Sequence, residues 1–203
     1  MALAVYENAR SLLGWEPAAS PTAVMVMLSR LTTLAFYVLI VAAYLRRRAA
    51  SSTASSPAAR VSAIIATFLP FSFPVIGYHT NSTLGLIVAN VLLVCGTGFA
   101  AWGVRHLDRS FSVIAQARAL VTSGPYRWVR HPLYTGELVA AAGVAILVGT
   151  PWAVLVWLAL LGLQLFRTRY EEAVLTAAFP EYQTYAARTG RLLPRLQRQP
   201  VAS

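Results

Sequence analysis

Apolar residues of this chain gather into five long stretches, separated by short polar or arginine-rich segments. A membrane-spanning α-helix needs about 20 mostly apolar residues, because each residue adds about 1.5 Å of rise. The pattern therefore predicts an all-α integral membrane protein with five transmembrane helices, forming a single domain over residues 1–203. The predicted spans are residues 22–45, 61–78, 83–104, 133–150 and 152–166.

Prolines and one charge modify this simple pattern. Pro70 and Pro74 stand one helical turn apart in the second span and remove backbone donors, so we expect a kink there. Only a tight turn at Pro151 separates the last two spans, which predicts an antiparallel hairpin. Arg30 is the one charge in the first span; we expect it to snorkel to the outer interface, with a functional ion pair as the alternative.

Composition supports a membrane protein. Of the 203 residues, 57% are hydrophobic and only 12% are charged, whereas a soluble domain carries about 25% charged residues. The single cysteine, Cys95, excludes an internal disulfide and a thiolate metal cluster. The first twenty residues include two glutamates and no basic start followed by an apolar core, so we do not expect a cleaved signal peptide.

The positive charge predicts the orientation. The formal net charge is +10, and no lysine occurs. If the first span ends in the cytoplasm, then Arg46–Arg48, Arg60, the 105–130 loop and everything after Phe166 fall on that side. This asymmetry predicts an outside N-terminus and a cytoplasmic C-terminus, and it explains the charge without nucleic acid as a partner.

Ionisable residues collect where the fourth span begins, in the string RHPLYTGE at 130–137. Pro132 suits the first position of a helix, and the free backbone donors of that helix start would attract an anionic group. Tyr134 and Glu137 are three residues apart and share a helix face, which must turn toward the bundle or a wet cavity. The alternative is an interfacial belt, with aromatic rings at the headgroup level and His131 as a helix cap.

A second polar cluster follows the fifth span. Glu171 and Glu172 come after Arg167 and Arg169, and pairing along a solvated helix at i+4 and i+3 is one interpretation. The hairpin favours another, because it brings the start of the fourth helix beside the end of the fifth. We therefore expect Arg130, His131 and Tyr134 to meet Tyr170, Glu171 and Glu172.

The third span carries small residues. Gly96 and Ala100, four residues apart, form a stripe suited to close helix packing. The alternative is that Gly96 and Gly98 allow a ligand to lie against the helix backbone.

These motifs together resemble one superfamily of membrane enzymes, the isoprenylcysteine carboxyl methyltransferases and phospholipid methyltransferases. The resemblance rests on the GxG at 96–98, "RHLDRSFS" at 105–112, "LVTSGPYRWVRHPLYTG" at 120–136 and "RYEEAVLTAAFPEYQTY" at 169–185. It implies S-adenosylmethionine as cofactor, held by segments 105–137 and 167–194, and methyl transfer to a lipid-borne or hydrophobic acceptor such as a prenylcysteine carboxylate or a phospholipid amine. The positions that match the family's cofactor-binding motifs are Gly96, Gly98, Gly124, Tyr126, His131, Pro132, Tyr134, Gly136, Glu171 and Glu172.

The resemblance also suggests roles for single residues. The cofactor's carboxylate would lie near Arg130, and Glu172 would accept from its ribose or ammonium group. Tyr134 or Tyr126 would pack on the adenine or the sulfonium. A carboxylate acceptor needs no base, whereas an amine must lose a proton, so His131 and Glu137 are the candidate bases. Arg130, His131 and Glu137 are therefore the candidate catalytic residues.

Two other functions stay open. One is a nicotinamide-dependent membrane reductase related to sterol reductases, although those chains are longer. The other is a non-enzymatic membrane scaffold whose arginines contact lipid headgroups. We expect no metal cofactor and no obligatory protein partner. The alanine-rich, lysine-free composition suggests a bacterial inner membrane with the site at the cytoplasmic face.

Overall fold

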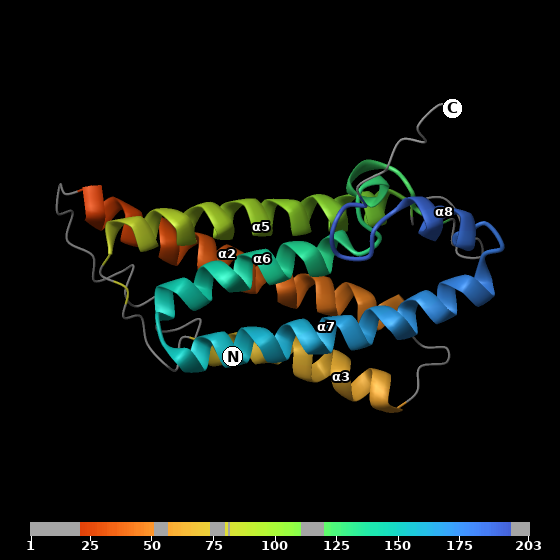
Figure 1. Ribbon diagram of the computed structural model, residues 1–203, viewed down its shortest axis with the longest axis horizontal. Helices are drawn as coiled ribbons and strands as arrows, with labels where there is room; N and C mark the ends of the chain where they lie inside the picture. Colours follow the sequence, from red (N-terminus) through yellow and green to blue (C-terminus); the bar gives the residue numbers. More distant parts are fainter. Residues whose placement is uncertain (1–20, 51–56, 74–79, 81, 111–119, 196–203) are drawn as a thin grey trace, which may run out of the picture.

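The computed structural model of the protein describes residues 21–50, 57–73, 80, 82–110 and 120–195. In these ranges the regular elements are helices, and Figure 1 shows α2, α5, α6 and α7 side by side along the long axis of the molecule. The predicted all-helical class is confirmed. The bounds are α2 Pro21–Ala50, α3 Pro57–Phe68, η1 Leu69–Ser72, α5 Thr83–Ser110, η2 Gly124–Arg127, α6 Pro132–Val148, α7 Pro151–Ala178 and α8 Tyr182–Arg188.

Three of the described helices are long and apolar enough to cross a membrane, judged by length and composition. They cover Pro21–Ala43 of α2, Thr83–Leu107 of α5 and Pro151–Ala178 of α7. The predicted fourth span corresponds to α6, a shorter apolar helix of 17 residues. The count of five spans and the orientation of the chain stay predictions.

The predicted second span is not one continuous α-helix among the described residues. Helix α3 ends at Phe68, and the 3-10 turn η1 follows with Pro70 near its start. Proline lacks a backbone donor and crowds the preceding turn, which explains why the α-helix ends where the sequence predicts a kink. Pro74 lies outside the described residues. The Tyr37 hydroxyl of α2 donates to the Pro70 carbonyl at 3.2 Å and fastens this turn to the bundle.

The turn between α6 and α7 forms as predicted. Gly149 ends α6 with a left-handed φ of 64°, and its amide donates to the Ala145 carbonyl at 2.9 Å. Thr150 caps α7 by accepting a hydrogen bond from the Ala153 amide at 3.3 Å, and Pro151 opens the helix. The chain therefore reverses within two residues, and the start of α6 lies beside the later part of α7 (Figure 1).

Helices α5 and α6 touch backbone to backbone. A Cβ added to Gly96 would lie 2.4 Å from the Ala140 amide nitrogen, and one added to Gly136 would lie 2.5 Å from the Ala100 nitrogen. Both glycines are therefore required by packing, which is the small-residue interpretation of the third span. Gly98 faces open space, since no atom lies within 4 Å of an added Cβ.

A polar contact joins α2 to α5 inside the bundle. The Asn90 amide donates to the Ser29 hydroxyl at 2.8 Å and to the Met25 carbonyl at 3.2 Å. Arg30, the neighbour of Ser29, is half-buried, and its expected snorkelling stays a prediction.

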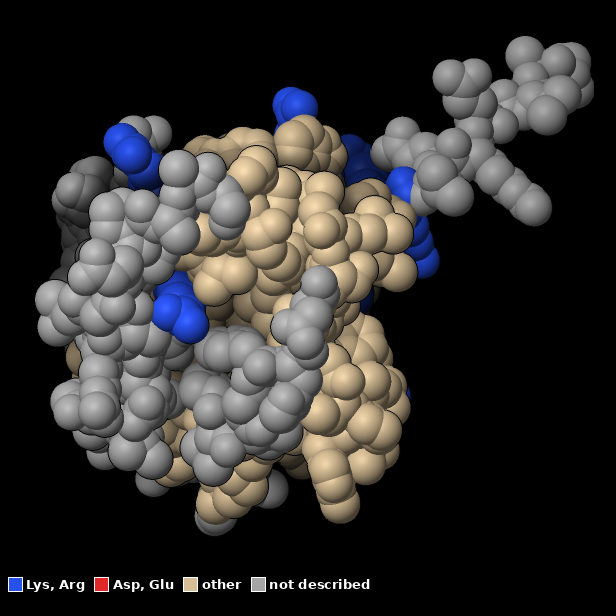
Figure 2. All heavy atoms as spheres, turned by 90° about the vertical axis from the view of Figure 1, so that its left-hand side faces the viewer, with Lys and Arg blue, Asp and Glu red and all other residues tan. Residues whose placement is uncertain are grey.

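The two ends of the bundle differ in charge. Figure 2 looks onto the end where α2, α5 and α7 begin, and the described surface there is mostly uncharged apart from a few arginines. Glu171, Glu172 and Glu181 belong to the opposite end, where α7 stops and α8 packs (Figure 1). The fold therefore concentrates its carboxylates where the sequence predicts a site.

Candidate functional site

The C-terminal segment 189–195 returns to the start of α6 and fixes it in place. Val129 and Gly190 form a parallel β-bridge, and the Arg130 amide donates to the Gly190 carbonyl at 2.8 Å. One residue further, the His131 amide donates to the Arg191 carbonyl at 3.2 Å. The Thr135 hydroxyl donates to the Leu192 carbonyl at 2.8 Å. This segment thus aligns the Arg130 and His131 side chains for the contacts that follow.

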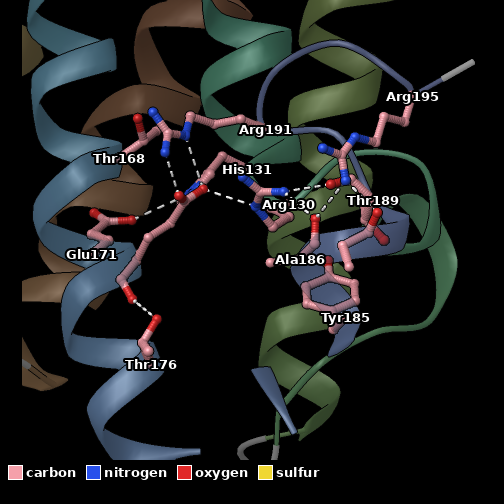
Figure 3. Close-up of polar contacts among 12 residues, drawn as sticks. Arg130, His131, Thr168, Glu171, Thr176, Tyr185, Ala186, Thr189, Arg191 and Arg195 are labelled. Atoms are coloured by element: carbon pink, nitrogen blue, oxygen red, sulfur yellow. Dashed lines mark hydrogen bonds and ion pairs between the residues drawn. The ribbon is translucent and has the colours of Figure 1, made fainter. Parts of the chain in front are cut away.

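Glu172 of α7 is the centre of the site. Its Oε1 accepts hydrogen bonds from Arg130 Nε at 2.8 Å and from Arg191 Nε at 3.0 Å, and it lies 3.2 Å from His131 Nε2. Its Oε2 accepts from Arg191 Nη2 at 2.6 Å. Figure 3 shows the Arg130, His131 and Arg191 side chains converging from two separate parts of the chain. The predicted meeting of the two helix ends is confirmed for Glu172, whereas the predicted Tyr170 is 39% exposed and its ring packs on Phe166. We call Arg130, His131, Glu171, Glu172 and Arg191 the charged cluster.

His131 lies between the two adjacent glutamates. Its Nδ1 is 3.5 Å from Glu171 Oε2, while its Nε2 faces Glu172. Burial alone lowers the pKa of the imidazole, but the hydrogen bonds and charges of both glutamates outweigh this effect and raise the pKa above its usual 6.5. The site therefore favours the imidazolium form of His131.

Tyr134 belongs to the same group. Its hydroxyl donates to Glu171 Oε1, and its ring stacks on the His131 ring with a centroid distance of 5.7 Å and an interplanar angle of 15°. Tyr134 is only 1% exposed, so the interpretation as an interfacial belt residue does not hold for it. Pro132, also buried, opens α6 as predicted.

Arg130 also organises α8 and the segment after it. Its Nη1 donates to the Ala186 carbonyl at 2.9 Å and to the Thr189 carbonyl. The same guanidinium therefore binds Glu172 and holds the end of α8 in place.

Two tyrosines of α8 border the charged cluster, and the sequence analysis did not select either. The Tyr185 hydroxyl donates to the Tyr126 carbonyl at 2.6 Å, and burial raises the pKa of Tyr185. Tyr182 is 2% exposed, and within the described part of the chain its hydroxyl has no hydrogen-bond partner. Burial, with the nearby Glu172 charge adding to it, raises the pKa of Tyr182 to about 12. Tyr182 is thus a buried neutral hydroxyl beside the Arg130 guanidinium.

The remaining predicted residues lie around this centre. Gly124 has a φ of +60°, and an added Cβ would lie 2.4 Å from the His106 ring, so glycine is needed there for the backbone. The Tyr126 hydroxyl reaches the Gly103 carbonyl at 3.5 Å. The cofactor roles of Gly96, Gly98, Gly124, Tyr126 and Gly136 stay predictions.

Glu137 lies in the interface of α6 and α7. It is 5% exposed, and its Oε2 accepts a hydrogen bond from Gln164 Nε2 at 2.6 Å. Sequence reasoning missed Gln164, because its neighbours Leu163 and Leu165 make it look like one polar residue in an apolar run. The predicted role of Glu137 as a base stays a prediction.

The interpretation of α7 as a solvated helix does not hold for Arg167 and Glu172. Arg167 turns into the bundle, where its guanidinium carbon lies 4.6 Å from the centroid of the Tyr134 ring. Glu172 takes its partners from the start of α6 and from Arg191 instead. Arg191 was missed as well, since no helical spacing links it to Glu172; only the return of the chain brings them together.

The described residues contain no group of three or more His, Cys, Asp or Glu side chains that could hold a metal ion. Their site chemistry is that of hydrogen-bonded ions and aromatic rings, at one end of an apolar helical bundle. These features define a helical membrane protein whose charged site is built from the last two long helices and the segment after them.

Comparison with known proteins gives the family. The family model described as phospholipid methyltransferase matches residues 84–182, a range that includes α5, α6, α7 and both glutamates of the charged cluster. The chain belongs to the phospholipid methyltransferase family. Enzymes of this family generally use S-adenosylmethionine as methyl donor.

Two bacterial relatives carry names that refer to metal resistance. The nickel-cobalt-cadmium resistance protein NccN of Alcaligenes xylosoxydans xylosoxydans is 38% identical over 148 residues, which cover 61% of this chain and 70% of that protein. The cobalt-zinc-cadmium resistance protein CzcN of Cupriavidus metallidurans is 42% identical over 79 residues, or 38% of this chain. That second match spans 36% of the relative's length.

Proposed function

We propose that this protein is an S-adenosylmethionine-dependent methyltransferase that acts on a lipid-borne or hydrophobic acceptor, with its active site at the cytoplasmic face of a bacterial inner membrane. One observation carries the proposal. In the charged cluster, Arg130 of one family motif binds Glu172 of another, more than thirty residues further along the chain. Beside them lies the buried Tyr182 hydroxyl, which has no hydrogen-bond partner by distance in the described structure.

The side chains present fit the cofactor group by group. Its carboxylate needs hydrogen-bond donors, and we assign it to the Tyr182 hydroxyl, which lies beside the Arg130 guanidinium. Its ammonium and ribose hydroxyls need acceptors, which the oxygens of Glu171 and Glu172 supply. Its sulfonium suits an aromatic face, but the Tyr134 ring already contacts the Arg167 guanidinium and the His131 ring, so we do not assign the sulfonium to Tyr134.

Bound there, the cofactor supplies an activated methyl group for in-line displacement by a nucleophile of the acceptor. The protein has two tasks, to hold both partners in line and to exclude water, and these supply most of the acceleration in such a transfer. Arg130 and Glu172 fix orientation through charge-assisted hydrogen bonds.

The electrostatics favour a carboxylate acceptor over an amine. A carboxylate oxygen attacks without losing a proton, whereas an amine needs a base near its nitrogen. Both ring nitrogens of His131 face a glutamate, so neither is directed at the nitrogen of an acceptor amine. We therefore propose a prenylcysteine carboxylate or a similar hydrophobic acid ahead of a phospholipid amine.

The test is isothermal titration calorimetry on the detergent-solubilised protein, with S-adenosylhomocysteine, NADPH and Zn²⁺ as separate ligands. We expect S-adenosylhomocysteine alone to bind, and Glu172→Ala and His131→Ala to weaken it by about 1–3 kcal/mol, the size of a lost charge-assisted contact. Glu181→Ala, at an exposed position of the same end, is the matched control. Binding of NADPH alone would establish the reductase alternative, and Zn²⁺ alone a metal-handling role like that in the relatives' names. Binding of none of the three would favour the scaffold.

A further inference from the structure

A chain of polar side chains runs from the interior of the α6–α7 interface toward the charged cluster. Gln164 of α7 is 0% exposed, and its Nε2 donates to Glu137 Oε2 of α6 at 2.6 Å. Its Oε1 accepts a hydrogen bond from Arg167 Nη1 at 3.3 Å. The side-chain amide thus connects a carboxylate on one helix to a guanidinium on its own helix.

This connection solves an electrostatic problem. A buried carboxylate or guanidinium in an apolar bundle is costly unless an opposite charge or hydrogen bonds compensate it. A glutamine amide both donates and accepts, so it links opposite charges without changing the sign of either. Glu137 and Arg167, which are 5% and 9% exposed, therefore stabilise each other through Gln164.

The outer end of the chain touches the proposed cofactor site. The Arg167 guanidinium lies over the Tyr134 ring, 4.6 Å from its centroid, as in a cation–π contact. The Tyr134 ring also stacks on His131, and its hydroxyl donates to Glu171. A displacement of Arg167 would therefore allow the ring that borders His131 to move.

We propose that Glu137 and Gln164 are positioning residues: they hold Arg167 against Tyr134 and so keep Tyr134 and His131 oriented for cofactor binding. The proposal rests on the proposed function and deepens it. It gives Glu137 a role other than that of a base, because the carboxylate is fixed by a short hydrogen bond inside the helix interface. Neither residue needs to touch the cofactor or the acceptor.

An exchange of the two side chains separates this role from simple packing. In the double variant Glu137→Gln/Gln164→Glu, the new glutamine on α6 donates to the new glutamate on α7, which accepts directly from Arg167. The number of charges and the connection are both preserved. Gln164→Leu breaks the connection on both sides, and Gln164→Glu alone places two carboxylates against each other.

Leu160→Ala is the matched control for the interface. Leu160 lies one turn before Gln164 on α7, is 0% exposed, and belongs to the hydrophobic core. The control should lower the thermal midpoint by leaving a cavity, yet keep the affinity for S-adenosylhomocysteine. A purely structural role of Gln164 would give its variants this same behaviour.

The experiment measures the dissociation constant for S-adenosylhomocysteine by calorimetry and the thermal midpoint separately. We expect wild-type protein to bind, Gln164→Leu to bind roughly tenfold more weakly, and the exchanged double variant to recover to within about threefold of wild type. If Gln164→Leu does not fold, Glu137→Gln takes its place, since it keeps the shape and the hydrogen bond but removes the charge; we expect about threefold weaker binding.

Each result has a distinct meaning. Unchanged affinity in Gln164→Leu, or in Glu137→Gln where that variant replaces it, overturns the positioning role alone. The positioning role is also overturned if the double variant Glu137→Gln/Gln164→Glu folds but binds as weakly as Gln164→Leu. Restoring the hydrogen bonds between α6 and Arg167 would then have no effect on cofactor binding. No binding by the wild-type protein overturns the proposed function, and the positioning role with it.

Discussion

Replacing Glu172 by glutamine tests the centre of the site. Glu172 accepts hydrogen bonds from Arg130, from His131 and, through both of its oxygens, from Arg191. Glutamine keeps the shape and one acceptor oxygen. Its amide group, however, would face the Arg191 Nη2 donor. Arg130, His131 and Arg191 would also lose the negative charge of Glu172 that compensates all three.

The magnitude follows from the burial of these groups. The Glu172 side chain is 12% exposed and that of Arg130 is 11%, so their contact is largely screened from solvent. Removing one partner of a buried ion pair costs about 3–5 kcal/mol. The Arg191 side chain is 35% exposed, so its ion pair with Glu172 contributes less to the free energy of unfolding. We therefore expect Glu172→Gln to lose about 3 kcal/mol of stability, or roughly 6–12 °C of melting temperature for a chain of this size.

The assay is thermal unfolding in detergent, followed by tryptophan fluorescence, with Glu181→Gln as a control that should melt like the wild type. Arg191→Gln is then added to Glu172→Gln. It removes one of the uncompensated cations, so the double variant should lose less stability than the two single losses added together. Additive losses, or a Glu172→Gln protein that melts at the wild-type temperature, would refute the shared-carboxylate reasoning.

Three further predictions concern separate parts of the molecule. Gly96→Ala should destabilise the protein by about 1–3 kcal/mol, because the new methyl group meets the α6 backbone, whereas Gly98→Ala should be neutral or slightly stabilising; parallel thermal melts check both. The raised pKa of His131 makes its contribution to stability complete below pH 6.5 and lost as the pH rises through the folded-state pKa, so melting between pH 6 and 9 should show a decline that His131→Gln removes. Tyr182→Phe should melt within about 1 °C of wild type and bind S-adenosylhomocysteine about fivefold more weakly by calorimetry, since the hydroxyl has no partner to lose in the described structure.

The sequence predicts most of the framework because its signals are local. Apolar length, the turn at Pro151 and the helix start at Pro132 each depend on neighbouring residues, and the structure has the corresponding helices. The second span was the exception. Two prolines one turn apart predict a kink, but whether the α-helix continues beyond the first proline depends on tertiary contacts such as that between Tyr37 and Pro70.

The site divides in the same way. Arg130, His131 and Glu172 were predictable, because a hairpin of known direction brings its two ends together. Arg191 was not, since its approach to Glu172 requires the segment after α8 to return and bridge to Val129. Gln164 could not be predicted for another reason. A single amide in an apolar run has no periodicity, and its role depends on the hydrogen bond to Glu137 on the facing helix.

The missing arginine changes the electrostatic character of the site. Without Arg191, the charged cluster would hold Arg130 and His131 against two glutamates. Its net charge would be zero with His131 protonated and negative with His131 neutral. With Arg191 the two arginines balance the two glutamates, and a protonated His131 makes the charged cluster net positive. Such an excess of positive charge attracts a carboxylate, and both the proposed cofactor and an acidic acceptor carry one. The segment after α8, which carries no signal in the sequence, would therefore give the proposed site its preference for an anionic group.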